Sequence, residues 1–274
     1  MDIWIAKIVF RNNLCRFLTK SQVGNTDGID PDSVVNMLLT DSYISVGDDG
    51  VSIKSDNITT AAGTTMMMAT RNITMRRLQI RSRNWCIGSS TFGGVYDILF
   101  EDSVIGDPKD IVAGQVPWAF KFKSHEFFPG PIENILVRRI EIAAVASTPW
   151  MYPSIVAGAF ELGLRYAGTP RRRSGTPRAR NITFEDIYVH SAGTPGKVQG
   201  LPESCFEELT FRNVTFGKLV HSTSWSCSDV EEHSFSHTEV RPPFPKCTNT
   251  APPNGTCGST HHAAASPDAD EAHF

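Results

Sequence analysis

The sequence predicts an all-β protein, a parallel β-helix whose coils stack short strands into sheets. The first observation is a repeat. A six-residue motif occurs seven times, most often opening with Asn or Asp, continuing with β-favouring residues around a variable position and closing with a polar residue. The copies occupy residues 7–12, 36–41, 72–77, 97–102, 134–139, 181–186 and 208–213. Their starting points lie 29, 36, 25, 37, 47 and 27 residues apart, so a coil takes at least about 25 residues and the excess is loop.

The second observation is the alternation of apolar and polar residues inside each copy. In residues 181–186, Ile182 and Phe184 alternate with Thr183 and Glu185, which is the period of a strand with one face buried. Equivalent points about 25 residues apart cannot be joined by tight hairpins, so equivalent strands stack in parallel. A β-sandwich, the alternative, predicts strands at regular spacings of about 8–12 residues.

The two ends of the chain differ from the repeat. Residues 1–10 resemble the middle of a strand and lack the basic start and apolar core of a secretory signal. We therefore expect the β-helix to occupy residues 1–241 and to lack N-terminal coils and a cap that an upstream segment would supply. Five prolines and a small, polar end predict a tail at residues 242–274. The prolines are Pro242, Pro243, Pro245, Pro252 and Pro253.

Composition excludes several classes of partner. The formal net charge of −3 argues against a strongly basic nucleic-acid binder, and no apolar run is long enough to span a membrane. Six cysteines and five Asn-x-Ser/Thr sequons suit an oxidising, glycosylating compartment, although three of those sequons belong to the repeat itself. Because no secretory signal is present, either the protein is intracellular or the upstream segment is missing. His261 and His262 lack further ligands, so we expect no metal and no cofactor.

Three aspartates are the best candidates for chemistry. Asp27 and Asp49 are 22 residues apart, close to one coil, so they are expected on neighbouring rungs about 4.8 Å apart, with Asp48 beside them. Crowded carboxylates raise at least one pKa, as a general acid beside a general base requires. Aspartate also favours turns, and that explanation is preferred for Asp30 and Asp32.

Longer motifs around these aspartates resemble the polygalacturonases, glycoside hydrolase family 28, in their plant and bacterial polygalacturonase-like branch. The resemblance covers about residues 5–247. Its motifs are Asn25-Thr26-Asp27-Gly28-Ile29-Asp30-Pro31-Asp32-Ser33, Gly47-Asp48-Asp49, Ile53-Lys54-Ser55, Ile87-Gly88-Ser89, Gly93-Gly94-Val95 and Trp225-Ser226-Cys227-Ser228-Asp229-Val230-Glu231.

The resemblance implies a right-handed β-helix that hydrolyses α-1,4-galacturonide bonds of pectin with inversion. Asp48 would be the general acid, and Asp27 and Asp49 would hold and deprotonate the attacking water. An inverting pair is expected to have carboxyl groups about 6.5–9.5 Å apart. The substrate-binding residues implied are Asn25, Lys121, Lys123 and Tyr166. The resemblance also implies an extracellular or cell-wall location and, with its N-terminal coils present, a monomer.

Three departures from the family pattern are visible. Many polygalacturonases carry Gly-His-Gly before the Ile-Gly-Ser segment, where this chain has Ser82-Arg83-Asn84-Trp85-Cys86 and no histidine nearby; Lys121 stands where the family has arginine, and Gly50 replaces a cysteine. Lysine lacks the bidentate fork of arginine, so Lys121 is expected to hold a uronate less specifically. The terminal pattern of the family suggests a disulfide between Cys227 and Cys247, which geometry must decide.

Other interpretations remain open at this stage. A β-helix that binds acidic polysaccharide without cleaving it would also fit the departures. A calcium-dependent pectate lyase would share the fold but would not explain the Asn-Thr-Asp and Asp-Asp motifs. An arginine cluster between Tyr166 and the next strand is either a steering surface for an anionic polymer or, preferably, a solvated loop. The cluster comprises Arg171, Arg172, Arg173, Arg178 and Arg180.

Overall fold

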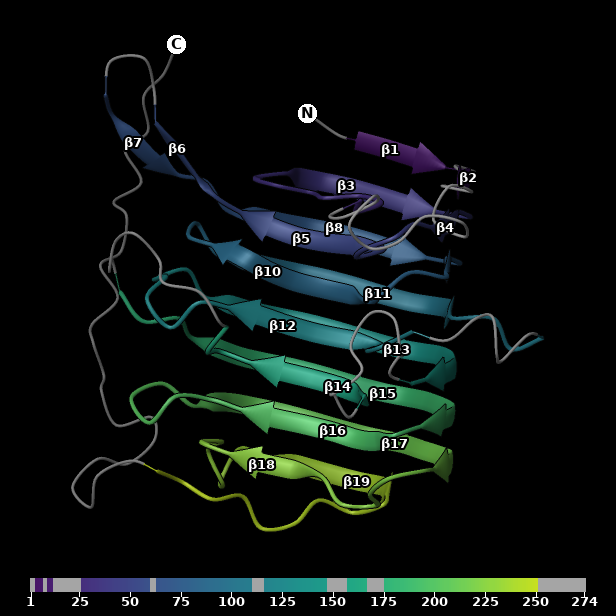
Figure 1. Ribbon diagram of the computed structural model, residues 1–274. Coiled ribbons are helices and arrows are strands. Elements are labelled where there is room, and N and C mark those ends of the chain that lie inside the picture. The colour runs from purple at the N-terminus through teal and green to yellow at the C-terminus, as the bar shows by residue number, and fades with distance from the viewer. Residues whose placement is uncertain are drawn as a thin grey trace.

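The computed structural model of the chain describes residues 3–6, 9–11, 26–59, 63–109, 116–146, 157–166 and 175–250. Every regular element in these ranges is a strand, and none of them forms a helix long and apolar enough to cross a bilayer. The strands stack in chain order from β1 to β19 along one axis (Figure 1). Nearly all neighbours in the stack are parallel, which confirms the parallel β-helix predicted from the repeat.

The larger sheet has the order β1-β3-β8-β11-β13-β15-β17-β19, with β2, β4 and β9 paired alongside. Its members are β1 (Ile3–Ala6), β2 (Val9–Arg11), β3 (Val35–Thr40), β4 (Tyr43–Ser45), β8 (Thr70–Arg76), β9 (Gln79–Ile80), β11 (Val95–Ile105), β13 (Ile132–Val145), β15 (Ala179–Ala192), β17 (Phe206–Leu219) and β19 (Ser236–Arg241). Each long strand of this sheet carries one copy of the repeated motif.

The second sheet has the order β18-β16-β14-β12-β10-β5. Its strands are β5 (Val51–Ser55), β10 (Trp85–Thr91), β12 (Phe120–Ser124), β14 (Gly158–Gly163), β16 (Thr194–Gln199) and β18 (Ser226–Ser228). An antiparallel hairpin of β6 (Asn57–Thr59) and β7 (Thr65–Met67) follows β5 and projects from the stack (Figure 1).

The ends of the repeated motif bend the strands of the larger sheet. The first and last residues of the six copies between residues 36 and 213 all have left-handed backbones, with φ between 49° and 63°. Asn and Asp tolerate this conformation better than other non-glycine residues, which explains their recurrence. Neighbouring coils then align the bends, and Nδ2 of Asn134 donates to Oδ1 of Asp97 at 2.9 Å.

Aromatic side chains fill the space between the two sheets. Trp85 of β10 stacks on Phe100 of β11, with ring centroids 5.4 Å apart. Phe160 of β14 meets Phe184 of β15 and Phe211 of β17 edge to face. All five side chains are fully buried, and each such side chain stabilises the fold by about 1.5–3 kcal/mol. The apolar positions of the repeat therefore form the core that the alternation predicted.

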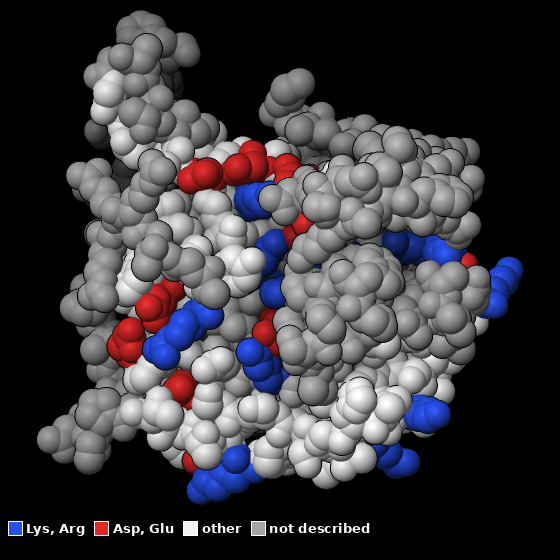
Figure 2. All heavy atoms as spheres, in the orientation of Figure 1, with Lys and Arg blue, Asp and Glu red and all other residues white. Residues whose placement is uncertain are grey.

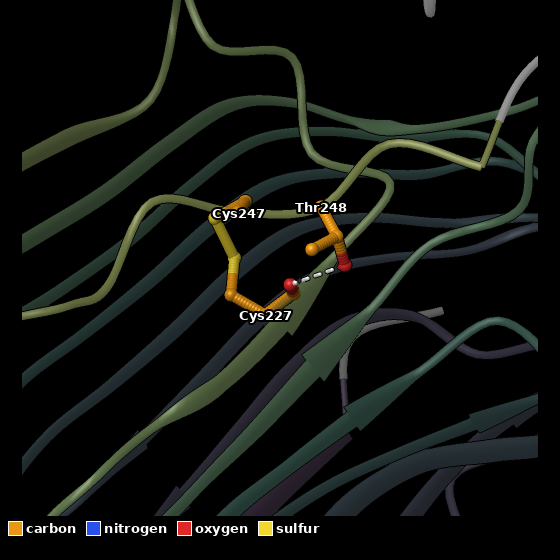
Figure 3. The surroundings of a disulfide bond; sticks show 3 residues. All are labelled: Cys227, Cys247 and Thr248. Carbon is orange, nitrogen blue, oxygen red and sulfur yellow. Dashed lines mark hydrogen bonds between the residues drawn. A yellow bond between two sulfur atoms is a disulfide. The ribbon is translucent and has the colours of Figure 1, made fainter.

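The C-terminal end of the stack is closed by residues that follow β19. Cys227 of β18 forms a disulfide with Cys247, as the family pattern suggested (Figure 3). Beside it the Thr248 hydroxyl donates to the Cys227 carbonyl oxygen at 3.3 Å. Phe244 is 8% exposed and stacks on Trp225. Residues 242–250 thus lie against the last coil, and residues 251–274 fall outside the described part of the chain.

Candidate active site

Two turns stacked on one another bring the predicted aspartates together. The N–H of Gly28 donates to the carbonyl oxygen of Asp49 at 2.9 Å, and Ile29 pairs with Val51 in parallel. This register has the offset of 22 residues seen in the sequence, so Asp27 and Asp49 occupy neighbouring rungs as expected. Glycine is required at position 28, because a Cβ there would lie 2.5 Å from the carbonyl oxygen of Gly50.

The three carboxylates face one cleft. One carboxylate oxygen from each of Asp27, Asp48 and Asp49 lies within 4.8 Å of the other two. The cleft has a volume of about 690 Å³ and lies outside β5, β10 and β12. In the space-filling view, acidic and basic atoms lie beside one another on the face that carries these strands (Figure 2). Asp48 and Asp49 line this cleft although they are only 6% and 3% exposed.

The surroundings of Asp27 and Asp48 favour their protonated forms. Burial, followed by the charge of Asp49, raises the pKa of Asp27 to about 6, while Lys54 opposes the shift. Burial also raises the pKa of Asp48, against the charge of Arg83, and Asp49 adds to the rise. Both groups can therefore hold a proton at a pH where an exposed aspartate has lost it.

Asp49 has the opposite tendency. Burial works toward a higher pKa, but the ammonium group of Lys123 and the hydrogen bonds from Lys123 and the Cys86 thiol outweigh it, and the pKa of Asp49 is lowered. The surroundings thus favour the anion of Asp49 beside two carboxyls whose pKa values are raised. This division is what an acid and a base working together need.

Each carboxylate of the cluster also has a cationic partner. The ion pairs are Lys54 with Asp27 (3.6 Å) and Asp30 (2.5 Å), Arg83 with Asp48 (2.7 Å), and Lys123 with Asp49. The carboxylate oxygens are close enough to one another to share a metal ion. However, the ammonium and guanidinium groups already offset the negative charge that would attract it.

Lys121 is the exception among the cations. It lies on β12 with Lys123, and the alternation along this strand turns both lysines outward while Phe120 and Phe122 are buried, as predicted. Its ammonium lies 3.7 Å from the ring centre of Trp118 and 5.8 Å from that of Tyr166. Burial lowers its pKa. Among the described residues lining the cleft, Lys121 is the cation without an ion pair.

The sequence missed several residues that line the cleft. Arg83, Trp118 and Lys54 were not among the predicted site residues, yet all three line it. The spacing offered a signal for Arg83, because it follows Asp49 by 34 residues and β5 pairs with β10 at the same offset, as in Ser52 with Cys86. Tyr166 lines the cleft as predicted, whereas Asn25 falls outside the described residues.

The arginine cluster divides between described and undescribed residues. Arg178 pairs with Glu207 at 2.8 Å, and Arg180 pairs with Glu208 at 2.6 Å on the outside of the larger sheet. These two side chains therefore balance surface carboxylates, consistent with the preferred interpretation of a solvated loop. Residues 171–173 lie outside the described part of the chain.

The closest carboxylate oxygens of the three aspartates lie near one another. Inverting glycosidases have carboxyl groups about 6.5–9.5 Å apart, and retaining ones about 5–5.5 Å. Here the closest oxygens of every pair lie within 4.8 Å of each other. The reason is the one-rung offset, which stacks Asp27 directly against the Asp48-Asp49 turn. A closest-oxygen distance is shorter than the separation of the two carboxyl groups, so this spacing is compatible with either stereochemical outcome.

Comparison with known proteins finds relatives that are named polygalacturonase or endo-polygalacturonase. The chain is 28% identical over 214 residues to a "Probable polygalacturonase" of Vitis vinifera, a match covering 76% of this chain and 40% of that protein. It is 27% identical over 213 residues to an endo-polygalacturonase of Pectobacterium carotovorum subsp. carotovorum, with 77% and 44% covered. No family model matches the chain.

The chain spans less than half the length of these two relatives. A shorter match, 35% identical over 123 residues, is with a polygalacturonase of Ralstonia nicotianae and covers 44% of this chain and 20% of the relative. The resemblance first drawn from the aspartate motifs is thereby confirmed, because these relatives carry the names polygalacturonase and endo-polygalacturonase.

Proposed function

We propose that this protein hydrolyses α-1,4-galacturonide bonds of pectic galacturonan by acid and base catalysis. The observation that carries the proposal is the cleft itself. It combines three converging carboxylates, whose surroundings push their pKa values in opposite directions, with a half-buried lysine, Lys121, that has no ion-pair partner among the described residues. The relatives named polygalacturonase support the same substrate class.

The proposed roles follow from the protonation of each group. Asp48, whose pKa burial raises, gives its proton to the glycosidic oxygen as the bond to C1 breaks. Asp49, held anionic by Lys123, takes a proton from the attacking water. Asp27 lies within 4.8 Å of both and positions that water. Lys121, in contact with Trp118, binds the carboxylate of a uronate.

Incubation with polygalacturonate tests the proposal. We expect new reducing ends, no ultraviolet-absorbing unsaturated product, and no loss of rate when a chelator is added. A chelator-sensitive unsaturated product would instead identify a calcium-dependent lyase. Binding of galacturonan without any release of reducing ends would identify a non-catalytic polysaccharide-binding protein and overturn the proposal.

The stereochemistry requires a separate measurement, because the closest-oxygen distances of the aspartates are compatible with either outcome. We propose inversion, as the family resemblance implies, with Asp49 acting on water rather than on the sugar. Proton NMR of the first products, recorded before mutarotation, would then show the β-anomer at the new reducing end. An initial α-anomer would contradict inversion and indicate a covalent intermediate.

We propose an extracellular or cell-wall location for the protein. The Cys227–Cys247 disulfide supports it, since structural disulfides persist in oxidising compartments. Fractionation of the source cells, followed by detection of the protein with an antibody, would check the location. A wholly cytosolic pool would contradict it.

A further inference from the structure

Arg83 occupies a fixed place beside the proposed acid. It lies in the turn before β10, and Asp48 lies in the turn before β5, the parallel neighbour of β10. The N–H of Arg83 donates to the carbonyl oxygen of Asp48 at 2.9 Å, and the N–H of Gly50 donates to the carbonyl oxygen of Asn84 at 2.9 Å. Two backbone hydrogen bonds therefore lock the two turns together.

The side chain of Arg83 then returns to the same aspartate. Its Nη1 lies 2.7 Å from Oδ1 of Asp48, and the two side chains are only 11% and 8% exposed. Exposed ion pairs contribute little to stability, because solvent screens the two charges and the two long side chains lose conformational entropy when they pair. This pair is mostly shielded, and its backbone is held on both sides, so neither limitation applies in full.

We propose that Arg83 is a positioning residue for Asp48. The guanidinium of Arg83 orients the Asp48 carboxyl toward the cleft and stabilises the carboxylate that remains when Asp48 has donated its proton. The inference rests on the proposed function, because it assigns a donor role to Asp48.

The charges around Asp48 show why an anion there needs support. Asp49 from its own turn and Asp27 from the preceding turn both oppose a negative charge on Asp48. Lys123 of β12 favours it, but this lysine is already paired with Asp49. Arg83 is the cation in direct contact with the Asp48 carboxylate. Without Arg83, Asp48 would release its proton only at higher pH and its carboxyl would lose a fixed orientation.

The test is a titration of Asp48 without substrate, in the full chain labelled with ¹³C at the aspartate carboxyl carbons. The Asp48 resonance is identified by its loss in Asp48→Asn. In Arg83→Gln we expect the pKa of Asp48 to rise by about one unit or more, a tenfold change in the protonation equilibrium. Arg83→Lys keeps the charge but loses the fork, so an intermediate rise is expected.

A matched control is available on the same segment. Arg81 pairs with Asp107 at 3.3 Å with similar burial, but it lies outside the residues that line the cleft. Arg81→Gln should leave the titration of Asp48 unchanged. An Asp48 titration that coincides with wild type in either Arg83 variant would overturn the inference, so it remains testable even where one variant fails to fold.

Kinetics separate this inference from the proposed function. With polygalacturonate, Arg83→Gln should shift the alkaline limb of the kcat/KM profile, which reports the pKa values of the free enzyme, to higher pH by the same amount as the titration. A wild-type protein that releases no reducing ends, but whose Asp48 titration depends on Arg83, would overturn the proposed function and support the positioning of Asp48. An active wild type whose alkaline limb is unmoved in Arg83→Gln would overturn the positioning role alone.

Discussion

Asn181 donates a hydrogen bond from Nδ2 to Oδ1 of Asn134 at 2.9 Å, although 47 residues separate them. Asn134 in turn donates to Asp97, so one row of side chains joins three successive coils. Each of the three residues has a left-handed backbone, with φ between 52° and 59°. The row shows that the loop lengths between copies vary while the coils remain in register.

We predict that the left-handed backbone at Asn134 can be measured directly. Asn134→Ala should lower the free energy of unfolding by about 1 kcal/mol more than Asn134→Gly, because both lose the side-chain hydrogen bonds but only alanine resists a positive φ. Urea denaturation of the two variants checks this difference. Equal stability of the two variants would show that φ at this position does not control stability.

The disulfide between Cys227 and Cys247 should stabilise the folded protein by an amount that increases with the length of the loop it closes. Replacing both Cys227 and Cys247 by serine should lower stability by about 3 kcal/mol, the chain-entropy value for a loop of roughly this length. Thermal melting checks the loss, with Thr238→Ser as a control on the exposed surface of β19. A double variant with the same melting temperature as wild type would mean that the packing of Phe244 and its aromatic neighbours is enough to hold the C-terminal end of the stack.

Lys121 should control affinity for the acidic polymer. Loss of a charge-assisted hydrogen bond costs about 1.5–3 kcal/mol, so Lys121→Gln should raise KM for polygalacturonate about 10- to 100-fold. The control is Lys197→Gln, since Lys197 faces outward two strands further along the same sheet but outside the cleft. Equal KM values for wild type and Lys121→Gln would remove this lysine from the binding site.

The raised pKa of Asp27 should appear in the pH dependence of stability. Its pKa is about 6 in the folded protein and 3.8 without the fold, so the native state binds more protons between these values. The contribution of Asp27 to the free energy of unfolding is fully present below about pH 4 and is lost as the pH rises through about 6. Asp27→Asn should therefore gain stability relative to wild type on going from pH 4 to pH 7. Urea midpoints that differ by the same amount at both pH values would contradict this.

Much of the fold could be predicted from the sequence, because the residue pattern of the repeat determines both the buried face and the bends of each coil. The alternation within residues 181–186 specifies an inward face, and the Asn or Asp at each copy specifies a bend. The spacing between Asp27 and Asp49 also specified their stacking. Arg83 was harder to predict, since its role depends on a side chain returning to the preceding coil rather than on a local pattern. Trp118 was missed because it belongs to no copy of the repeat.

The rate of reducing-end release by Asp48→Asn shows whether the aspartate cluster cleaves galacturonan. Removing a general acid should lower kcat by about 10²- to 10⁴-fold, while the urea midpoint stays near that of wild type. Asp97→Asn is the control, since Asn fills the equivalent position in four other copies of the repeat and Asp97 lies outside the cleft. A rate for Asp48→Asn equal to that of wild type and Asp97→Asn would contradict the account.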